Sequence, residues 1–298
     1  MLNYDPHRWM DHLFDIRGSM VREIVWRVLF FTFWSIGIVF VHYRYFPLAI
    51  SPTVHNLVGT ALGLLLVFRT NSSYDRFWEG RKLWGSIINE TRNLVRMSEV
   101  FLAEDPARRE QIAFLAKAFP YAVMYTLRSR RDAFPEFILK ADLEQVKSIW
   151  NSAHPALEIA RKISVVLDSA KREKRIGEWT QLALDQNVQL LVDYLGGCER
   201  IHRTPIPFAY MVHLRRALIF YCASLPFALI DVLGWGSVIG TLLVTYVFFG
   251  IEEIGVEIED PFGDDANDLP LETFCLVIEK SVEGLRPLES SFNARSSS

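Results

Sequence analysis

A dense run of carboxylates lies near the end of the chain. The segment EDPFGDDANDLPLE places six of them around a Pro-Phe-Gly turn: Glu259, Asp260, Asp264, Asp265, Asp268 and Glu272. Such oxygen-rich loops suit Ca²⁺. The segment is not an EF-hand, because its glycine falls in the wrong place and no bidentate Glu closes a twelve-residue loop. Composition therefore favours a turn in which Asp260 holds backbone amides and Asp268 caps a helix beginning near Leu271, with a calcium site as the alternative.

Enzyme signatures are absent from the sequence. It has no Walker-type Gly-Lys-Ser/Thr, no dinucleotide fingerprint, no His-Glu-x-x-His and no Gly-x-Ser-x-Gly. His42 and His55 lie near two apolar segments, where a histidine pair could ligate a haem. They fall near the outer ends of different helices, so interfacial histidines are the better interpretation. We expect no enzyme, no catalytic residues and no required cofactor.

The apolar segment 50–68 has the pattern that most favours a function. Residues at i, i+3 or i+4 spacing share one helical face: Thr53, Leu57, Thr60 or Ala61, Leu64 and Phe68. Gly59 and Gly63 form a Gly-x-x-x-Gly pair on an adjoining face, suited to close helix approach. In a monomer the first face would pack inside a bundle. In a ring of subunits it could line a narrow apolar tube that gates ions by dewetting.

Four apolar segments position these residues. Residues 232–251 are uncharged and reach the roughly 20-residue length that a bilayer core requires. A second uncharged segment, residues 217–230, precedes this one, and only Asp231 separates the two. We expect Asp231 to lie at a turn and to be solvated. Residues 28–41 and 50–68 form a second pair, with Pro47 and Pro52 marking the turn. The alternative is four buried core helices of a soluble protein.

Charges beside these segments predict their orientation. Three groups of basic residues flank the same ends: Arg17, Arg22 and Arg27; Arg69, Arg76, Arg81 and Lys82; Arg200, Arg203, Arg215 and Arg216. In the two opposite loops, Arg44 is the only arginine or lysine. By the positive-inside rule, both termini and the block between the second and third spans are cytoplasmic.

Composition agrees with a membrane protein that carries a sizeable polar part. Of 298 residues, 50% are hydrophobic and 13% aromatic. A net charge of −3 argues against nucleic acid as a partner. The scattered Cys198, Cys222 and Cys275 predict free thiols. The charged opening MLNYDPHRWMDHLFD excludes a cleavable signal peptide.

The block between the second and third spans shows helical periodicity throughout and no strand pattern. One helix is expected to leave the membrane at Phe68 and continue toward Phe101, with a bend near Gly80 or Gly85. Another is expected to stop at Gly196–Gly197. The predicted organisation is an N-terminal segment 1–24, spans in 25–69, a cytosolic helical domain 70–205, spans in 206–256 and a C-terminal segment 257–298 with the acidic turn and tail.

Four motifs taken together resemble the bestrophin channel family, especially its bacterial branch. They are DIRGS, FRTNSSYDRFWEGRKLWG, LGGCERIHRTPIPFAY and EDPFGDDANDLPL, in order along nearly the whole chain. The resemblance implies a homopentamer with five copies of the second span around a pore. It places Thr60, Leu64 and Phe68 in a hydrophobic neck. Family members carry bulky residues at all three places, so Thr60 implies a wetter outer end. The resemblance also places Trp179, with Leu182 nearby, at a cytosolic aperture.

The resemblance also bears on the acidic turn. In animal members this segment holds Ca²⁺, and Asp265 and Asp268 match the carboxylates that supply side-chain oxygens. Asp260 stands where an Asn is usual, while Ala266 and Asn267 replace acids. The implied metal site, Asp260 with Asp265 and Asp268, is therefore depleted, and Ca²⁺ activation is not expected.

Ion sign stays open on the sequence. Animal and plant bestrophins conduct anions, whereas bacterial members include channels selective for monovalent cations. Arg69 would favour anions if it faced the lumen, but such an arginine can instead pair with an acid on another helix. Glu252, Glu253 and Glu257 could favour cations if they faced the pathway.

The sequence therefore predicts an all-α membrane protein with four transmembrane helices per subunit, a large helical cytosolic domain and a pentameric pore. We expect a passive channel for small monovalent ions, chloride or sodium, in a bacterial inner membrane. Its partners are copies of itself, membrane lipid and the permeating ions. The alternative is a membrane-anchored scaffold or sensor with a non-conducting central gap.

Overall fold

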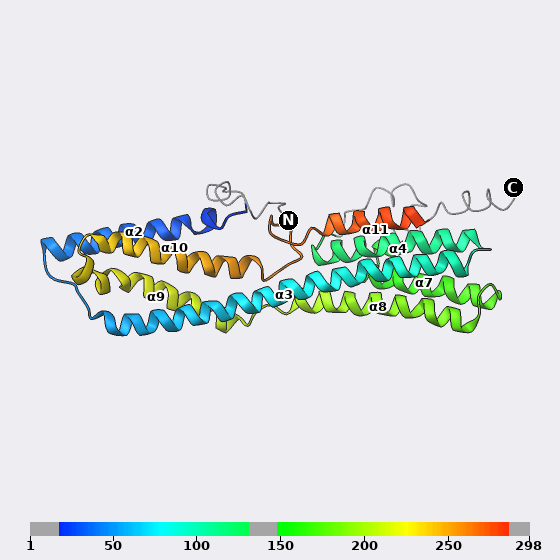
Figure 1. Ribbon diagram of the computed structural model, residues 1–298, viewed down its shortest axis with the longest axis horizontal. Coiled ribbons are helices and arrows are strands. Elements are labelled where there is room, and N and C mark those ends of the chain that lie inside the picture. The colour runs from blue at the N-terminus through cyan, green and yellow to red at the C-terminus, as the bar shows by residue number, and fades with distance from the viewer. Residues whose placement is uncertain (1–17, 131–147, 286–298) are drawn as a thin grey trace, which may run out of the picture. The chain divides into compact units, whose positions relative to one another are not determined.

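The computed structural model describes residues 18–130 and 148–285, and within these ranges every regular element is a helix. The expectations for residues 1–17 and for the tail from 286 lie outside them. The helices are α2 (Val21–Arg44), α3 (Pro52–Phe101), α4 (Pro106–Leu127), α7 (Pro155–Arg172), α8 (Glu178–Arg203), α9 (Phe208–Leu233), α10 (Gly236–Glu257) and α11 (Leu271–Leu285) (Figure 1).

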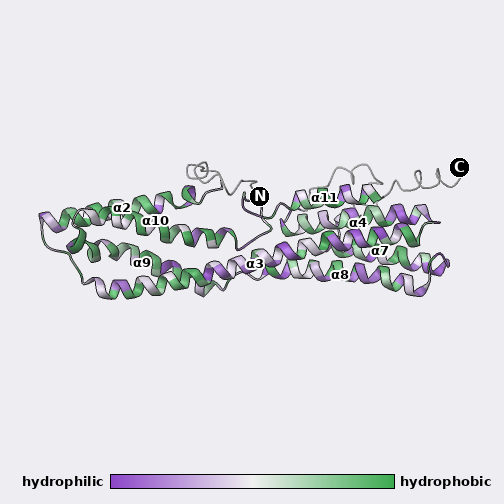
Figure 2. Cartoon of the chain, in the orientation of Figure 1, coloured by the Kyte–Doolittle hydropathy of each residue, from purple (hydrophilic) through white to green (hydrophobic). Residues whose placement is uncertain are grey.

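Four of these helices, α2, α3, α9 and α10, are long and apolar enough to cross a membrane. Figure 2 shows hydrophobic residues dominating α2, α9 and α10, whereas polar and apolar residues alternate along α7 and α8. The predicted all-α fold with four spans is confirmed.

Helix α3 is a single helix of 50 residues. The predicted continuation from Phe68 to Phe101 is therefore confirmed. The helix is unbroken at Gly80 and Gly85. The chain divides into two compact units, and α3 belongs to both: residues up to Trp78 lie in the first and those from Glu79 in the second.

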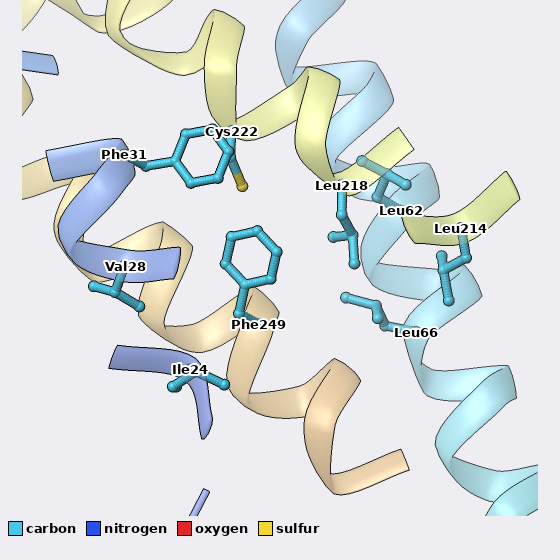
Figure 3. Close-up of a cluster of buried hydrophobic side chains, with 9 residues drawn as sticks. All are labelled: Ile24, Val28, Phe31, Leu62, Leu66, Leu214, Leu218, Cys222 and Phe249. Atoms are coloured by element: carbon cyan, nitrogen blue, oxygen red, sulfur yellow. The ribbon is translucent and has the colours of Figure 1, made fainter. Parts of the chain in front are cut away.

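The first unit, called here the membrane unit, contains α2, α9, α10 and the first part of α3. Within it α10 packs against both α2 and α9. Figure 3 shows the buried core, in which the rings of Phe31 on α2 and Phe249 on α10 stack with centroids 5.7 Å apart. Leu62 and Leu66 of α3 meet Leu218 of α9 in the same cluster. Apolar contacts from all four helices thus hold this unit together.

The turn between the last two spans differs slightly from the prediction. Asp231 lies in the last turn of α9 and is exposed. The chain reverses three residues later at Gly234, whose φ of +53° suits glycine because it has no Cβ. The fourth span therefore begins at Gly236 and not at residue 232.

The second unit is built around α4. Asp105 caps this helix by accepting a hydrogen bond from the Arg108 backbone N–H at 3.2 Å, and Pro106 occupies the first turn. The helix is buried on nearly all sides from Ile112 to Leu127, as expected of a central helix. Helices α7, α8 and α11 pack around it.

The predicted helix stop at Gly196–Gly197 is wrong, because α8 continues to Arg203. Gly197 instead permits close packing against α3. A Cβ at this position would lie 2.8 Å from Cδ2 of Leu83. A Cβ at Gly196 would meet nothing within 4 Å. One glycine of the pair therefore has a packing role, and neither ends the helix.

We predict that Gly197→Val lowers the free energy of unfolding by about 1–3 kcal/mol, because the added methyl groups overpack against Leu83. Gly196→Val is the matched control and should be neutral or slightly stabilising, since valine has the better helix propensity. Thermal unfolding of the detergent-purified protein measures both. Equal melting temperatures for the two variants would contradict this assignment.

Candidate functional site

The residues expected to form a neck lie on one exposed face of α3. Leu64 is 55% exposed and Phe68 is 56% exposed, and Thr60 is exposed on the same face. Leu62 and Leu66 point the other way and are buried in the membrane unit. Within its own chain, this face of α3 therefore does not pack inside the bundle.

The Thr60 hydroxyl is engaged within the helix. Its Oγ1 donates a hydrogen bond to the backbone carbonyl of Asn56 at 2.9 Å. Only its acceptor lone pairs remain for water, so Thr60 is a weaker polar element than an unbonded hydroxyl. The wetter outer end of the neck stays a prediction.

The two glycines of the Gly-x-x-x-Gly pair on α3 behave differently. A Cβ at Gly59 would lie 2.4 Å from the Tyr221 hydroxyl, so this glycine admits the aromatic ring of α9. A Cβ at Gly63 would meet nothing within 4 Å. Close approach of helices inside the chain thus uses Gly59.

Arg69, directly after Phe68, turns into the membrane unit. Its side chain is 1% exposed, and Nη1 donates to Oε1 of Glu252 on α10 at 2.7 Å. Nη2 lies 3.9 Å from Oε2 of Glu259. Of the two arrangements considered for Arg69, the structure shows the ion pair with an acid on another helix.

Glu252 is the centre of a larger ion cluster. Nε of Arg215 on α9 donates to the same oxygen, Oε1, at 2.8 Å. Nη1 of Arg27 on α2 lies 3.7 Å from the other oxygen and donates to Glu253 at 2.5 Å. A buried carboxylate is tolerated when it is paired and hydrogen-bonded in this way. Glu252 is therefore engaged with arginines and buried, while Glu257 accepts a hydrogen bond from Asn267 at 2.8 Å.

In the second unit, Arg128 holds the first part of the acidic turn. Its Nε donates to the carbonyl oxygens of Phe262 and Gly263 at 3.2 and 3.0 Å. Its Nη1 pairs with Asp264 at 3.2 Å and with Glu272. The Arg128 side chain is 4% exposed, so a buried guanidinium supplies the positive charge at these oxygens.

In the membrane unit, Asp268 closes the second part of the turn. Its Oδ2 accepts from the Asp265 backbone N–H at 2.7 Å, and its own N–H donates to the Asp265 carbonyl at 3.1 Å. Helix α11 begins at Leu271 as predicted, but the Asp268 carboxylate bonds back to Asp265 where a cap on that helix was expected. Asp260 and Asp265 are exposed.

The arrangement of the acidic side chains bears on the calcium alternative. Across residues 18–130 and 148–285, no three His, Cys, Asp or Glu side chains gather where they could hold a metal ion. The backbone oxygens of Phe262 and Gly263 face the Arg128 cation, which opposes a second cation there. The calcium site at Asp260, Asp265 and Asp268 stays an untested prediction without geometric support.

The structure also places Trp179, which the resemblance assigns to a cytosolic aperture, and the two histidines. Trp179, in the first turn of α8, is 83% exposed, and Leu182 is 60% exposed one turn later. His55 is buried and stacks on Tyr221 with ring centroids 4.0 Å apart. Nδ1 of His42 accepts from the Leu48 backbone N–H at 3.0 Å. The histidines have structural contacts, and His55 is more buried than an interfacial residue.

We predict that Glu252→Gln destabilises the protein by about 3–5 kcal/mol, because it deprives buried Arg69 of its nearest carboxylate and leaves only Glu259 at 3.9 Å. Glu253→Gln removes the same charge one residue away, where the partner Arg27 is 44% exposed, and should cost at most about 1 kcal/mol. Denaturant unfolding in detergent compares the two variants. Similar losses would show that the buried cluster has no special weight.

We also predict a pH dependence of stability from Asp268. Burial away from water raises the pKa of this carboxyl to about 6, aided by the charges of Asp265, Asp260 and Glu257, although the Asp265 N–H opposes the shift. The folded chain therefore keeps the proton that the unfolded chain loses near pH 4. Stability should fall by about 1–3 kcal/mol as the pH rises from about 4 to 6, and then level off.

The Asp268→Asn variant tests this dependence, because it keeps an oxygen for the Asp265 N–H and cannot ionise. Unfolding measured from pH 4 to 7 should lose most of the slope in this variant. Asp265→Asn, an exposed neighbour in the same turn, should keep it. A wild-type slope in the Asp268→Asn variant would contradict the assignment.

Comparison with known proteins gives one consistent family. The family model described as "Bacterial/Fungal Bestrophin protein" matches residues 1–284. A voltage-dependent anion channel-forming protein of Synechocystis sp. is 39% identical over 283 residues, covering 94% of this chain and 92% of its own length. The voltage-dependent anion channel-forming protein YneE of Escherichia coli is 33% identical over 283 residues, with the same two coverages of 94% and 92%.

A solved structure agrees with these relatives. The crystal structure of a bacterial bestrophin homolog from Klebsiella pneumoniae matches with a TM-score of 0.82 and 30% identity, covering 88% of this chain and 98% of that chain. Sequence and fold thus point the same way over most of the chain. The chain belongs to the bestrophin family, in its bacterial and fungal branch.

Proposed function

We propose that this chain forms a homopentameric channel that conducts small monovalent ions passively through a bacterial inner membrane. Five copies of α3 surround the pore, and Thr60, Leu64 and Phe68 form its hydrophobic neck. Both termini lie in the cytoplasm, and Trp179 lies at the cytosolic aperture. The observation that carries this proposal is the outward apolar face of α3, with Leu64 and Phe68 more than half exposed in a single chain.

The chemistry of this face suits a dewetting gate. Leu64 and Phe68 offer no hydrogen bond to water, and the Thr60 proton is already donated to Asn56. A narrow ring of such side chains is costly for a hydrated ion to cross until it widens. The charged residue nearest the neck, Arg69, is turned away from this face by its pair with Glu252.

Anions are the favoured permeant ions, because relatives at 39% and 33% identity carry names of anion channel-forming proteins. Monovalent cations such as sodium are the alternative. Neither Arg69 nor Glu252 supports a sign, since each neutralises the other inside the membrane unit. Selectivity therefore rests on other residues of the pathway.

We predict that Leu64→Ala and Phe68→Ala each raise single-channel conductance or open probability by several-fold, because they remove the apolar barrier to water. Ile239→Ala on α10 is the matched control. It removes a similar area from a side chain that is 64% exposed on another helix, and it should leave the current unchanged. Planar bilayers with purified protein measure all three.

The reversal potential under a NaCl gradient, measured on the same bilayers, decides the ion sign. A shift toward the chloride potential supports an anion channel, and a shift toward the sodium potential supports the cation alternative. If wild type, Leu64→Ala and Phe68→Ala all carry no current, the channel proposal fails and a membrane-anchored scaffold or sensor takes its place. Native mass spectrometry of the same preparation tests the pentamer.

A further inference from the structure

A cavity of about 520 Å³ opens in the membrane unit among α2, α9 and α10. Its walls are mostly apolar and include Phe30 and Ile219. The charged lining residues are Arg27, Arg215 and the carboxylate Glu252, which is paired with arginines. Phe30 and Ile219 are 64% and 50% exposed. The function proposed above assigns no role to this cavity.

The two arginines are positioned by carboxylates and yet keep free donors. Among the described residues, Arg27 donates through Nη1 to Glu253, and Arg215 donates through Nε to Glu252. Each guanidinium carries five N–H donors in a fixed fork. Both side chains remain 44% exposed, so the remaining donors can reach a ligand that enters the cavity.

The order of groups along the helices matches an amphiphile. Trp26, which is 77% exposed, and Arg27 stand at the start of the apolar part of α2, and Arg215 stands at the corresponding start on α9. Phe30 follows Trp26 by one turn, and Ile219 follows Arg215 by one turn. Charged donors thus lie at one end of the cavity and an apolar wall extends from them.

The end that carries the arginines is the cytoplasmic end in the orientation proposed above, and this inference rests on that orientation. Tryptophan and arginine at that depth are typical of the membrane interface. Basic pockets between transmembrane helices on the cytoplasmic side suit anionic lipid headgroups. Arginine binds phosphate oxygens in its plane with charge-assisted hydrogen bonds.

We propose that this cavity binds an anionic phospholipid of the cytoplasmic leaflet, with the headgroup phosphate on Arg27 and Arg215 and an acyl chain along Phe30 and Ile219. A soluble phosphate would satisfy the donors and leave the apolar wall uncovered. A second copy of the chain could also cover the apolar wall. The remaining N–H donors of the two guanidinium groups favour an anionic ligand instead. Charge complementarity at one end and apolar length at the other favour the lipid.

The test is native mass spectrometry of the full-length protein purified in equal amounts of phosphatidylglycerol and phosphatidylcholine. Wild type should retain phosphatidylglycerol preferentially. Arg215→Gln should lower that preference about tenfold, the loss typical of a charge-assisted hydrogen bond. Arg216→Gln, an exposed arginine one residue further along α9 that does not line the cavity, should leave it unchanged.

A second variant keeps the test decisive if Arg215→Gln fails to fold. Ile219→Trp fills the apolar wall without altering any ion pair, and it should also release the lipid. Added glycerol phosphate should not displace the bound lipid. The proposal is overturned if wild type retains both lipids equally, if Arg215→Gln and Arg216→Gln behave alike, or if glycerol phosphate competes fully. Lipid retention is measured without current, so failure of the channel proposal and failure of this one are distinguishable.

Discussion

The burial of one carboxylate constrains the membrane unit. Glu252 lies inside a mostly apolar bundle, where an unpaired charge would be costly, so arginines must reach it from neighbouring helices. Arg69 does so from α3 and Arg215 from α9. At about 100° of rotation per residue, turning Arg69 inward carries its neighbour Phe68 away from the bundle. The ion pair thus fixes which face of α3 points away from the bundle.

This arrangement separates two requirements that a channel helix must meet. The buried face of α3, with Leu62 and Leu66, supplies the cohesion of the subunit. The outward face can then remain apolar and weakly hydrated, because no residue on it is needed to hold the bundle together. The charges of Arg69 and Glu252 are used to position helices within the subunit.

Local patterns in the sequence were sufficient for much of the fold. Hydropathy windows located the spans, and the lack of a breaker after Phe68 predicted the long α3. The failure at Gly196–Gly197 has a tertiary cause, because only the presence of Leu83 distinguishes a packing glycine from a terminating one. The partners of Glu252 were equally beyond reach, since they come from helices far apart in the chain. The hydrogen bond of Thr60 to Asn56 follows a known i−4 habit of threonine in helices and could have been anticipated.

The first part of the acidic turn has its counter-charge at the C-terminal end of α4. Arg128, directly after the last residue of α4, donates to the carbonyls of Phe262 and Gly263 with a group that is covalently part of the chain. A tethered guanidinium has no dissociation constant, no off-rate and no dependence on ion supply. Because this positive group is part of the polypeptide, it is present in every folded copy of the chain, and a chelator cannot remove it.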